Sequence, residues 1–365
     1  MWCGTANHLQ KIEKRKQTEE DRGRKLTDEN GRSQVLYIIL GSILLTVNFV
    51  SNDQHLQDSM IGIDEEALET LSGTAASIAS NATNLSLPIY AISVYIATDN
   101  SWHRLTSPEP IPLFSHCVAV ERKLILVGGW DPVRLDPIPD VWIVDLVTGE
   151  WRKGRAMSIA RSFFACAAVG GRVYVAGGHD KMRNPLRTAE IYDVEADEWV
   201  ALPAMAEERD ESQGVAIGSI FWVISGYGAQ TMGQFTDSAE WYDPEKGVWL
   251  TEEGLCSEEN GSSACFAGGD VLWCVGRIGA RKYRGGSGWN EIAQAAEGMK
   301  ETSCMATMGD SKIFVMGAVR NGGGTADGRG NYGAWILDIG AGKWIKVETP
   351  ANFSGYAYTA AAVFI

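Results

Sequence analysis

The chain contains 365 residues, and its 46 aspartates and glutamates outnumber its 32 lysines and arginines, for a formal net charge of −14 at pH 7. This acidic balance argues against a nucleic-acid-binding protein, which needs a basic surface to neutralise phosphates. A hydrophobic content of 45% argues against a disordered chain. The seven cysteines form no Cys-x-x-Cys pair, which favours reduced thiols over a disulfide framework or a zinc site.

The N-terminal part of the chain differs in composition from the rest. Residues 1–34 are polar without an apolar period, and we expect them to be disordered. Residues 35–50 (VLYIILGSILLTVNFV) carry no charge, but as a helix they would span only about 24 Å, against about 30 Å for a hydrocarbon core. A membrane anchor and a pair of hydrophobic strands are both compatible with this segment. Residues 51–89 are predicted to be a linker.

From about residue 90 two sequence markers recur in register. One is a glycine marker after an apolar run, such as Gly128 and Gly129 in LILVGG and Gly177 and Gly178 in VYVAGG. The other is a tryptophan six residues after an aspartate, and it occurs as Trp151, Trp199, Trp249 and Trp344. Two markers that both recur at roughly 45–50 residues indicate a repeated structural unit.

Each unit is predicted to form four short strands, as at 165–169, 172–178, 189–194 and 198–202. The glycines suit a sharp turn where a Cβ would obstruct the neighbouring sheet. The tryptophan on the fourth strand is expected to bury its ring between adjacent sheets. Four-stranded units that repeat radially form a propeller.

The number of units predicts how the propeller closes. Five units carry a glycine marker and a tryptophan at this spacing, one of them through Trp289, which follows Tyr283 instead of an aspartate. Residues 90–96 and 101–105 supply only the third and fourth strands of another unit, and residues 355–365 supply an inner strand. Sharing one blade between the two ends of the chain removes an open sheet edge. We therefore predict an all-β fold, a six-bladed propeller over residues 90–365, with the second strand of the shared blade within 74–88.

The repeat resembles the kelch signature, in which an apolar strand runs into Gly-Gly and is followed by Tyr-Asp and then by Trp. Over roughly residues 90–365, RSFFACA (161–167), GGHDKMRNPLRTAEIYDVEADEWVALPAM (177–205) and ERDE (208–211) resemble the plant F-box/kelch-repeat proteins. This resemblance implies a kelch propeller that captures a protein substrate, often an enzyme of phenylpropanoid metabolism. It also implies an N-terminal F-box that docks on a Skp1–cullin ubiquitin ligase.

The sequence departs from that family before residue 90, where a complete F-box is not recognisable. Only GIDEEALETL (62–71) is similar to the opening of one. The resemblance therefore leaves the Skp1-like partner less supported than the protein substrate.

A protein-binding surface is expected at one mouth of the central channel, because arginine and aromatic side chains dominate protein hot spots. The loops that lead into first strands and those that follow the glycine pairs should meet there. They carry Arg161, Arg209, Trp130, His179, Lys181, Arg183 and Tyr227. Alternatively, Arg161 and Arg209 bond loop carbonyls or pair with Asp210 and hold the blades together. Glu207, Glu208 and Glu211 are expected to form a solvated acidic edge.

No motif supports catalysis. The propeller region contains only His103, His116 and His179, none at a repeated ligand position, and no phosphate loop or Ser-His-Asp order occurs. We predict a non-enzymatic substrate receptor of an SCF-type ubiquitin ligase in the cytoplasm or nucleus, without metal or cofactor. The alternative is a stand-alone kelch scaffold without a ligase connection, tethered to a membrane through residues 35–50.

Overall fold

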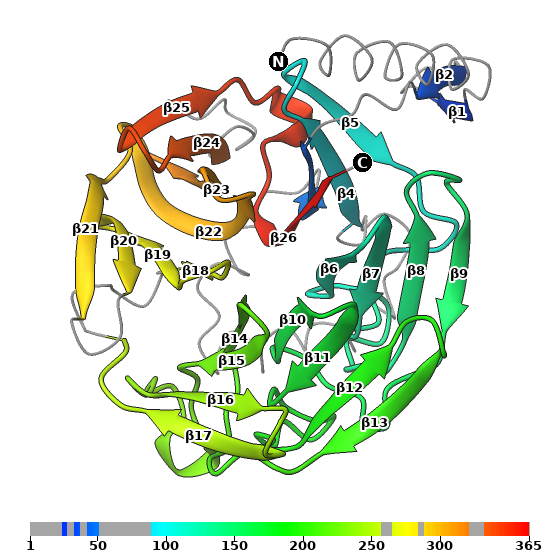
Figure 1. The fold of residues 1–365 in the computed structure, drawn as a ribbon. Helices are drawn as coiled ribbons and strands as arrows, with labels where there is room; N and C mark the ends of the chain where they lie inside the picture. The colour runs from blue at the N-terminus through cyan, green and yellow to red at the C-terminus, as the bar shows by residue number, and fades with distance from the viewer. Residues whose placement is uncertain are drawn as a thin grey trace, which may run out of the picture.

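The protein is a β-propeller in which four-stranded sheets surround a central channel (Figure 1). The computed structural model describes residues 89–256, 265–283, 288–320 and 332–364, together with three strands nearer the N-terminus. In these ranges the only helical elements are the 3-10 turns η2 (Ala229–Thr231) and η5 (Ala351–Phe353). No helix among the described residues is long and apolar enough to cross a membrane. The predicted all-β propeller is confirmed.

Five blades are built from strands that follow one another in the chain, with the first strand innermost. Blade 1 contains β6 (His116–Val120), β7 (Lys123–Val127), β8 (Val141–Asp145) and β9 (Trp151–Gly154). Blade 2 contains β10 (Ala165–Val169), β11 (Arg172–Ala176), β12 (Ala189–Asp193) and β13 (Glu198–Leu202). Blade 3 contains β14 (Gln213–Ile217), β15 (Ile220–Ile224), β16 (Ala239–Asp243) and β17 (Val248–Glu252). Blade 4 contains β18 (Cys265–Ala267), β19 (Trp273–Gly276), β20 (Gly279–Tyr283) and β21 (Trp289–Gln294), and blade 5 contains β22 (Met299–Met308), β23 (Lys312–Val319), β24 (Tyr332–Asp338) and β25 (Lys343–Val347).

A sixth four-stranded sheet, blade 6, joins the two ends of the chain, as predicted. Its order is β26 (Ala357–Phe364), β3 (Ser42–Val50), β4 (Ile89–Ile96) and β5 (Ser101–Leu105). Strand β3 pairs antiparallel with β26 on one side and with β4 on the other. This pairing joins the two ends of the chain in one blade and closes the ring.

The second strand of blade 6 is not where the sequence placed it. Residues 42–50 take the position expected for residues 74–88, which lie outside the described residues. A strand with neighbours on both sides is favoured by a continuous apolar, β-branched run, which accounts for the composition of this stretch. Residues 42–50 of the segment 35–50, for which a membrane anchor was one interpretation, are therefore a strand of the propeller. The propeller accordingly includes residues before residue 90, where it was predicted to begin.

Two further strands lie near the N-terminus, the first within residues 1–34, which were expected to be disordered, and the second across the end of that segment. β1 (Arg24–Thr27) and β2 (Ser33–Leu36) pair antiparallel in a separate two-stranded sheet. The predicted F-box-like stretch at 62–71 lies outside the described residues.

The glycine pairs reverse the chain at the end of the second strand, as predicted. Their φ angles are positive: +58° at Gly128, +93° at Gly129, +70° at Gly177 and +77° at Gly178. A Cβ on Gly129 would lie 2.4 Å from the carbonyl oxygen of Leu113, and one on Gly178 would lie 2.3 Å from that of Ser162. In blades 1 and 2 the second glycine of the pair thus lets two loops meet at the channel mouth.

The fourth-strand tryptophans bridge neighbouring blades by hydrogen bonds. Trp199 Nε1 donates to the carbonyl oxygen of Arg155 at 2.7 Å, and Trp249 Nε1 donates to that of Pro203 at 2.7 Å. The same kind of contact recurs through Trp289, Trp344 and Trp102. The prediction that these rings are buried core is corrected, because Trp151, Trp199, Trp249 and Trp344 are all half-buried. They cover the outer part of the gap between blades.

Replacing Trp199 with alanine should lower the free energy of unfolding by about 2–4 kcal/mol, because a large ring and an inter-blade hydrogen bond are both lost. Trp199→Phe keeps an aromatic ring and should cost only about 1 kcal/mol. Urea denaturation of the three proteins measures the difference. Equal midpoints for the alanine variant and the wild type would show that the tryptophan does not join the blades.

The first strands converge so closely around the channel that some positions tolerate no side chain. A Cβ on Gly214 in β14 would lie 2.2 Å from the backbone nitrogen of Cys166 in β10. One on Gly268, just after β18, would lie 1.6 Å from the carbonyl oxygen of Ala216. Cys117 and Cys166 are buried at the same position in blades 1 and 2, as expected for small packing groups. The channel is thus lined largely by small side chains.

Candidate functional site

Three loops on neighbouring blades meet at one mouth of the channel in the same backbone arrangement. Isolated antiparallel bridges join Leu113 to Trp130 in blade 1, Ser162 to His179 in blade 2, and Asp210 to Tyr227 in blade 3. Each bridge connects the loop before a first strand with the loop after a glycine marker. The predicted residues Trp130, His179 and Tyr227 therefore occupy equivalent positions.

The residue after each bridge adopts a left-handed backbone conformation. The φ angles are +55° at Phe114, +53° at Phe163 and +52° at Glu211, and none of these residues is glycine. Such conformations cost about 1–3 kcal/mol and concentrate at functional sites. Backbone geometry is therefore conserved from blade to blade while the side chain changes from aromatic to acidic.

Aromatic rings fill the mouth between blades 6, 1 and 2. Phe163 lies 4.8 Å from Phe114, 6.0 Å from Trp130 and 6.0 Å from Tyr358, measured between ring centroids. It also stacks on the imidazole of His179 at 5.5 Å. Phe114, Trp130 and His179 are buried, whereas Phe163 and Tyr358 are half-buried. The last two can therefore still meet a ligand.

His179 connects blade 2 with blade 3. Its Nδ1 lies 2.9 Å from both carboxylate oxygens of Asp210, and both side chains are buried. The sequence had suggested, as an alternative, that Asp210 pairs with Arg161 or Arg209. In the structure its carboxylate contacts His179 instead. Within the described part of the chain, His179 Nε2 and Trp130 Nε1 have no hydrogen-bond partner. A buried polar atom without a hydrogen bond lowers the stability of the fold, so such atoms are rare in a protein core. Two of them lie together at this mouth.

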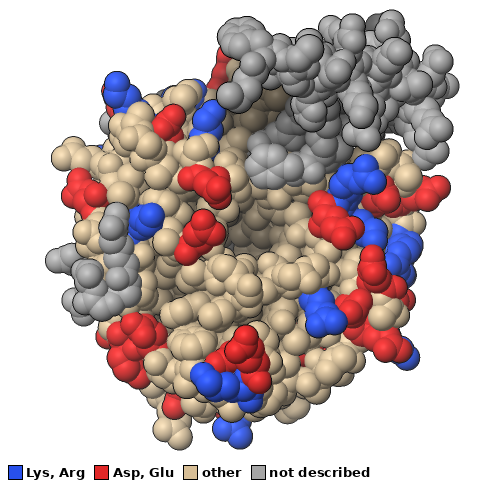
Figure 2. Space-filling view, viewed as in Figure 1, with Lys and Arg blue, Asp and Glu red and all other residues tan. Residues whose placement is uncertain are grey.

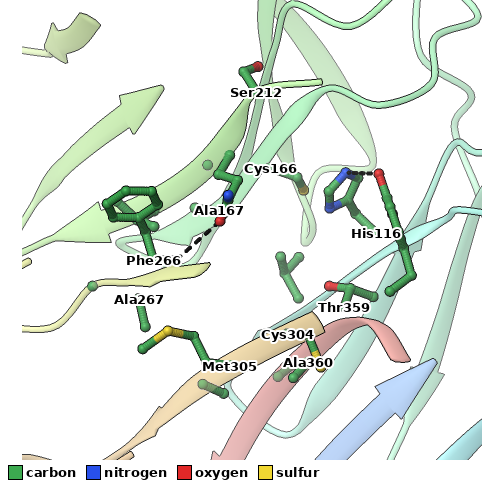
Figure 3. Close-up of a pocket in the computed structure, with 18 of the residues that line it drawn as sticks. His116, Cys166, Ala167, Ser212, Phe266, Ala267, Cys304, Met305, Thr359 and Ala360 are labelled. Atoms are coloured by element: carbon green, nitrogen blue, oxygen red, sulfur yellow. Dashed lines mark hydrogen bonds between the residues drawn. The ribbon is translucent and has the colours of Figure 1, made fainter. Parts of the chain in front are cut away.

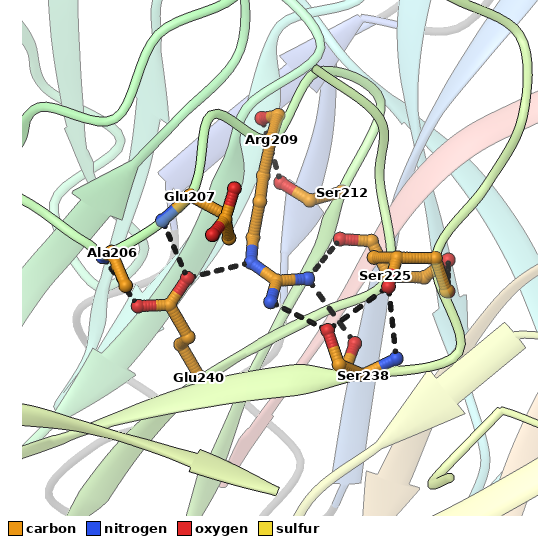
Figure 4. Close-up of polar contacts among 8 residues, drawn as sticks. Ala206, Glu207, Arg209, Ser212, Ser225, Ser238 and Glu240 are labelled. Carbon is orange, nitrogen blue, oxygen red and sulfur yellow. Dashed lines mark hydrogen bonds and ion pairs between the residues drawn. The ribbon is translucent and has the colours of Figure 1, made fainter. Parts of the chain in front are cut away.

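Arg209 lies in a closed network inside blade 3 (Figure 4). Its Nε donates to Glu240 at 3.0 Å, Nη1 donates to the carbonyl oxygens of Ser225 and Ser238, and Nη2 donates to Ser238 Oγ at 2.8 Å. Glu240 also accepts a hydrogen bond from the backbone nitrogen of Ala206 at 2.7 Å. Arg209 and Glu240 are both fully buried.

Arg161 repeats this arrangement in blade 2. It donates to the carbonyl oxygens of Gly177 and Thr188 at 2.9 and 3.0 Å and pairs with Glu190 at 3.2 Å. Its side chain is only 1% exposed. The expectation that Arg161 and Arg209 contact a partner is corrected, because neither guanidinium reaches the surface. They hold the loops of their blades in place, which is the structural alternative.

Lys181 and Arg183 are the predicted residues that remain accessible. Both are exposed on the loop after Gly178, and the Arg183 guanidinium lies 5.9 Å from the centre of the Trp130 ring. Tyr227 is half-buried and its hydroxyl donates to Glu211 at 3.0 Å. The predicted site thus divides into a basic exposed loop, a buried aromatic group and a buried pair of arginines.

The same loops expose large apolar side chains at their tips. Val133 is 70% exposed in blade 1, Met182 is 80% exposed in blade 2, and Met232 and Phe235 are 49% and 46% exposed in blade 3. Three adjacent loops that each present an apolar tip beside charged groups have the composition of a protein-binding patch.

Below the mouth the channel forms a cavity of about 1130 Å³ (Figure 3). The labelled side chains come from several first strands: Cys166 and Ala167 from β10, Phe266 and Ala267 from β18, Cys304 and Met305 from β22, and Thr359 and Ala360 from β26. Burial lowers the pKa of His116 to about 4, so this imidazole is neutral near pH 7, and Tyr358 Oη lies 3.3 Å from its Nε2. In the described segments, no three His, Cys, Asp or Glu side chains come together as metal ligands.

Figure 2 shows one face of the molecule, with the channel as a central hollow. Charged side chains of both signs lie mainly towards the outer edge, and acidic groups also lie close to the hollow. On this face, the described residues around the hollow form no continuous basic surface of the kind that nucleic-acid phosphates require.

Comparison with known proteins identifies similar chains. The model of the Kelch motif matches residues 114–158 and 160–206. F-box/kelch-repeat protein SKIP20 of Arabidopsis thaliana is 39% identical over 307 residues, covering 76% of this chain and 72% of that protein. Another Arabidopsis thaliana F-box/kelch-repeat protein is 33% identical over 313 residues, covering 82% of this chain and 86% of its own. The solved structure of YjhT superposes with a TM-score of 0.55 at 12% identity, covering 71% of this chain and 91% of that one, a likeness in fold alone.

Proposed function

Because the chain belongs to the F-box/kelch-repeat protein family, we propose that its propeller is a substrate receptor that captures a protein for a Skp1–cullin ubiquitin ligase. The captured protein is degraded by the proteasome, and an enzyme of the phenylpropanoid pathway is the candidate that the family resemblance favours. The propeller itself supplies recognition and no catalytic group.

The observation that carries this proposal is the unequal mouth formed by blades 1 to 3. Equivalent backbone positions hold Phe114, Phe163 and Glu211, and the loop of blade 2 presents two exposed basic side chains, Lys181 and Arg183, where that of blade 1 presents Arg134. A surface that served only to close the propeller could repeat one residue type. An asymmetric protein partner, in contrast, is recognised by different groups on each blade.

The ligase connection is tested by co-expression of the full chain with a plant Skp1-like subunit. We expect the two proteins to co-elute in size-exclusion chromatography. The alternative, a scaffold without a ligase connection, is favoured by the lack of a recognisable F-box pattern in residues 1–89. Separate elution of the two proteins would support the scaffold and contradict the ligase.

The capturing surface is tested by reversing the charge of the blade 2 loop. Lys181→Glu with Arg183→Glu should weaken capture by about 2 kcal/mol. Both side chains are exposed, and the substitutions turn their attraction to opposite charges on the partner into repulsion. The measurement is the amount of partner retained by immobilised protein from plant extract. Arg122→Glu, an exposed change at the β6–β7 turn on the opposite face, is the matched control and should retain the wild-type amount.

For this function we place the propeller in the cytoplasm or nucleus, where Skp1–cullin ligases act. Cys166 and Cys256 are free cysteines, which suits a reducing compartment.

A further inference from the structure

We propose that the channel mouth takes a basic side chain, arginine or lysine, from an exposed loop of the captured protein, and holds it between the rings of Phe163 and Tyr358 and the carboxylate of Glu211. This inference rests on the proposed function, because it names the chemistry of the segment that the propeller captures. All three residues line the same cavity, whose volume of about 1130 Å³ accommodates a long side chain and part of the loop that carries it.

The charge of the cavity favours a cation. Among the described residues that line it, the carboxylates are Glu211 and Asp237, and no lysine or arginine is present. His116, the one histidine of the lining, is neutral near pH 7 because burial lowers its pKa to about 4. Asp237 is exposed, and in the described ranges neither carboxylate forms an ion pair with a lysine or arginine. An incoming cation would thus be the first positive charge on the cavity lining, since the Arg183 guanidinium lies outside it, 5.9 Å from the centre of the Trp130 ring.

Glu211 is held at the mouth by its backbone and by a neighbour. It takes the left-handed position that Phe114 and Phe163 take in blades 1 and 2, with φ of +52°. One carboxylate oxygen accepts a hydrogen bond from Tyr227 Oη at 3.0 Å, and the side chain remains exposed. Partial removal from water and the nearby carboxylate of Asp210 both raise the pKa of Glu211. A bound cation would relieve this like-charge crowding.

Asp210 does not compete for the cation. Its carboxylate already lies 2.9 Å from His179 Nδ1 and is buried. Glu211 is therefore the carboxylate of this pair that can meet a ligand.

The aromatic rings complete the site. The centroids of Phe163 and Tyr358 lie 6.0 Å apart in an edge-to-face arrangement, and both rings are half-buried. Burial raises the pKa of Tyr358, and the charges of Glu211 and Asp210 add to this effect, so the phenol and the carboxylates are within electrostatic reach of one another. Aromatic faces attract cations, and the planar guanidinium of arginine also stacks on them. Rings beside an accessible carboxylate therefore suit a guanidinium or ammonium group better than an acid.

The test titrates the full chain with N-acetyl-arginine amide and, as its neutral isostere, with N-acetyl-citrulline amide. We expect the arginine derivative to bind, and the citrulline derivative to bind about tenfold more weakly or worse. Glu211→Gln should weaken arginine binding by about tenfold and leave citrulline binding unchanged. Glu195→Gln removes the same charge from an exposed turn between β12 and β13 and should change neither.

Equal binding of the two derivatives, or arginine binding that Glu211→Gln does not alter, would overturn the inference. The thermal midpoint of Glu211→Gln should match that of the wild type, because the side chain is exposed. These titrations need neither a ligase nor a partner. Arginine binding without co-elution of the Skp1-like subunit would thus contradict only the proposed function. Capture that is insensitive to Glu211→Gln would contradict only this inference.

Discussion

Arg209→Met is expected to lower the free energy of unfolding by about 3–5 kcal/mol, because it leaves the carboxylate of Glu240 buried without its counter-charge. The same change removes the donors for two backbone carbonyl oxygens and for Ser238 Oγ. Urea denaturation followed by tryptophan fluorescence measures the loss. Since both partners are about 1% exposed, water cannot replace the missing group.

Two further variants separate the buried charge from a general effect of losing an arginine. Arg209→Met combined with Glu240→Leu removes both charges and should regain much of the lost stability. Arg187→Met changes an exposed arginine nearby and should stay within about 0.5 kcal/mol of the wild type. If Arg209→Met lowered the free energy of unfolding by only about 1 kcal/mol, as the loss of a surface ion pair does, the Arg209 network would not stabilise blade 3 as described.

Gly178→Ala should lower the free energy of unfolding by about 2–5 kcal/mol. The residue has a φ of +77°, which disfavours a side chain, and its new Cβ would lie 2.3 Å from the carbonyl oxygen of Ser162. Because Ser162 bridges to His179, the substitution should also disturb the channel mouth. Thermal unfolding and the binding of N-acetyl-arginine amide would report both effects.

Gly170→Ala is the matched control for backbone conformation alone. Gly170 has a φ of +56° in the turn after β10, and no atom lies within 4 Å of the position that its Cβ would take. We expect a cost of about 1–2 kcal/mol. A cost for Gly178→Ala no larger than this would show that the close contact with the loop does not matter.

The repeat could be predicted because each of its marker residues is required by the backbone or the packing at its own position. The chain must reverse at Gly129 and Gly178 with positive φ, and a fourth-strand ring such as Trp199 must cover the gap to the next blade. Strand β3 carries neither marker, and its place depends only on pairing with segments distant in the chain. This is why the shared blade was predicted correctly and its second strand was not.

The loops that meet at the channel mouth were predicted, but the burial of two of their arginines was not. The loop positions of Arg161 and Arg209 were recognised, whereas their burial depends on Glu190 and Glu240 across the blade. A signal was present in the third strands, which read AEIYD at 189–193 and AEWYD at 239–243, with a glutamate between apolar neighbours.

Glu211 gave no comparable signal. It was expected to belong to a solvated acidic edge with Glu207 and Glu208, and all three residues are exposed. Its place beside the aromatic rings could not be predicted, because a left-handed position held by two phenylalanines and a glutamate shows no residue pattern. Only the bridges that align the loops of blades 1 to 3 make the three residues equivalent.

Capture of the partner protein is proposed to take place at the mouth formed by blades 1 to 3. Hydrogen–deuterium exchange of the full chain, with and without a partner purified by affinity capture, tests it most directly. We expect protection in the loops at 130–137, 179–187 and 227–237, with no change in the turns at 121–122, 170–171 and 195–197 on the opposite face. Protection confined to those turns, with the three loops unchanged, would contradict it.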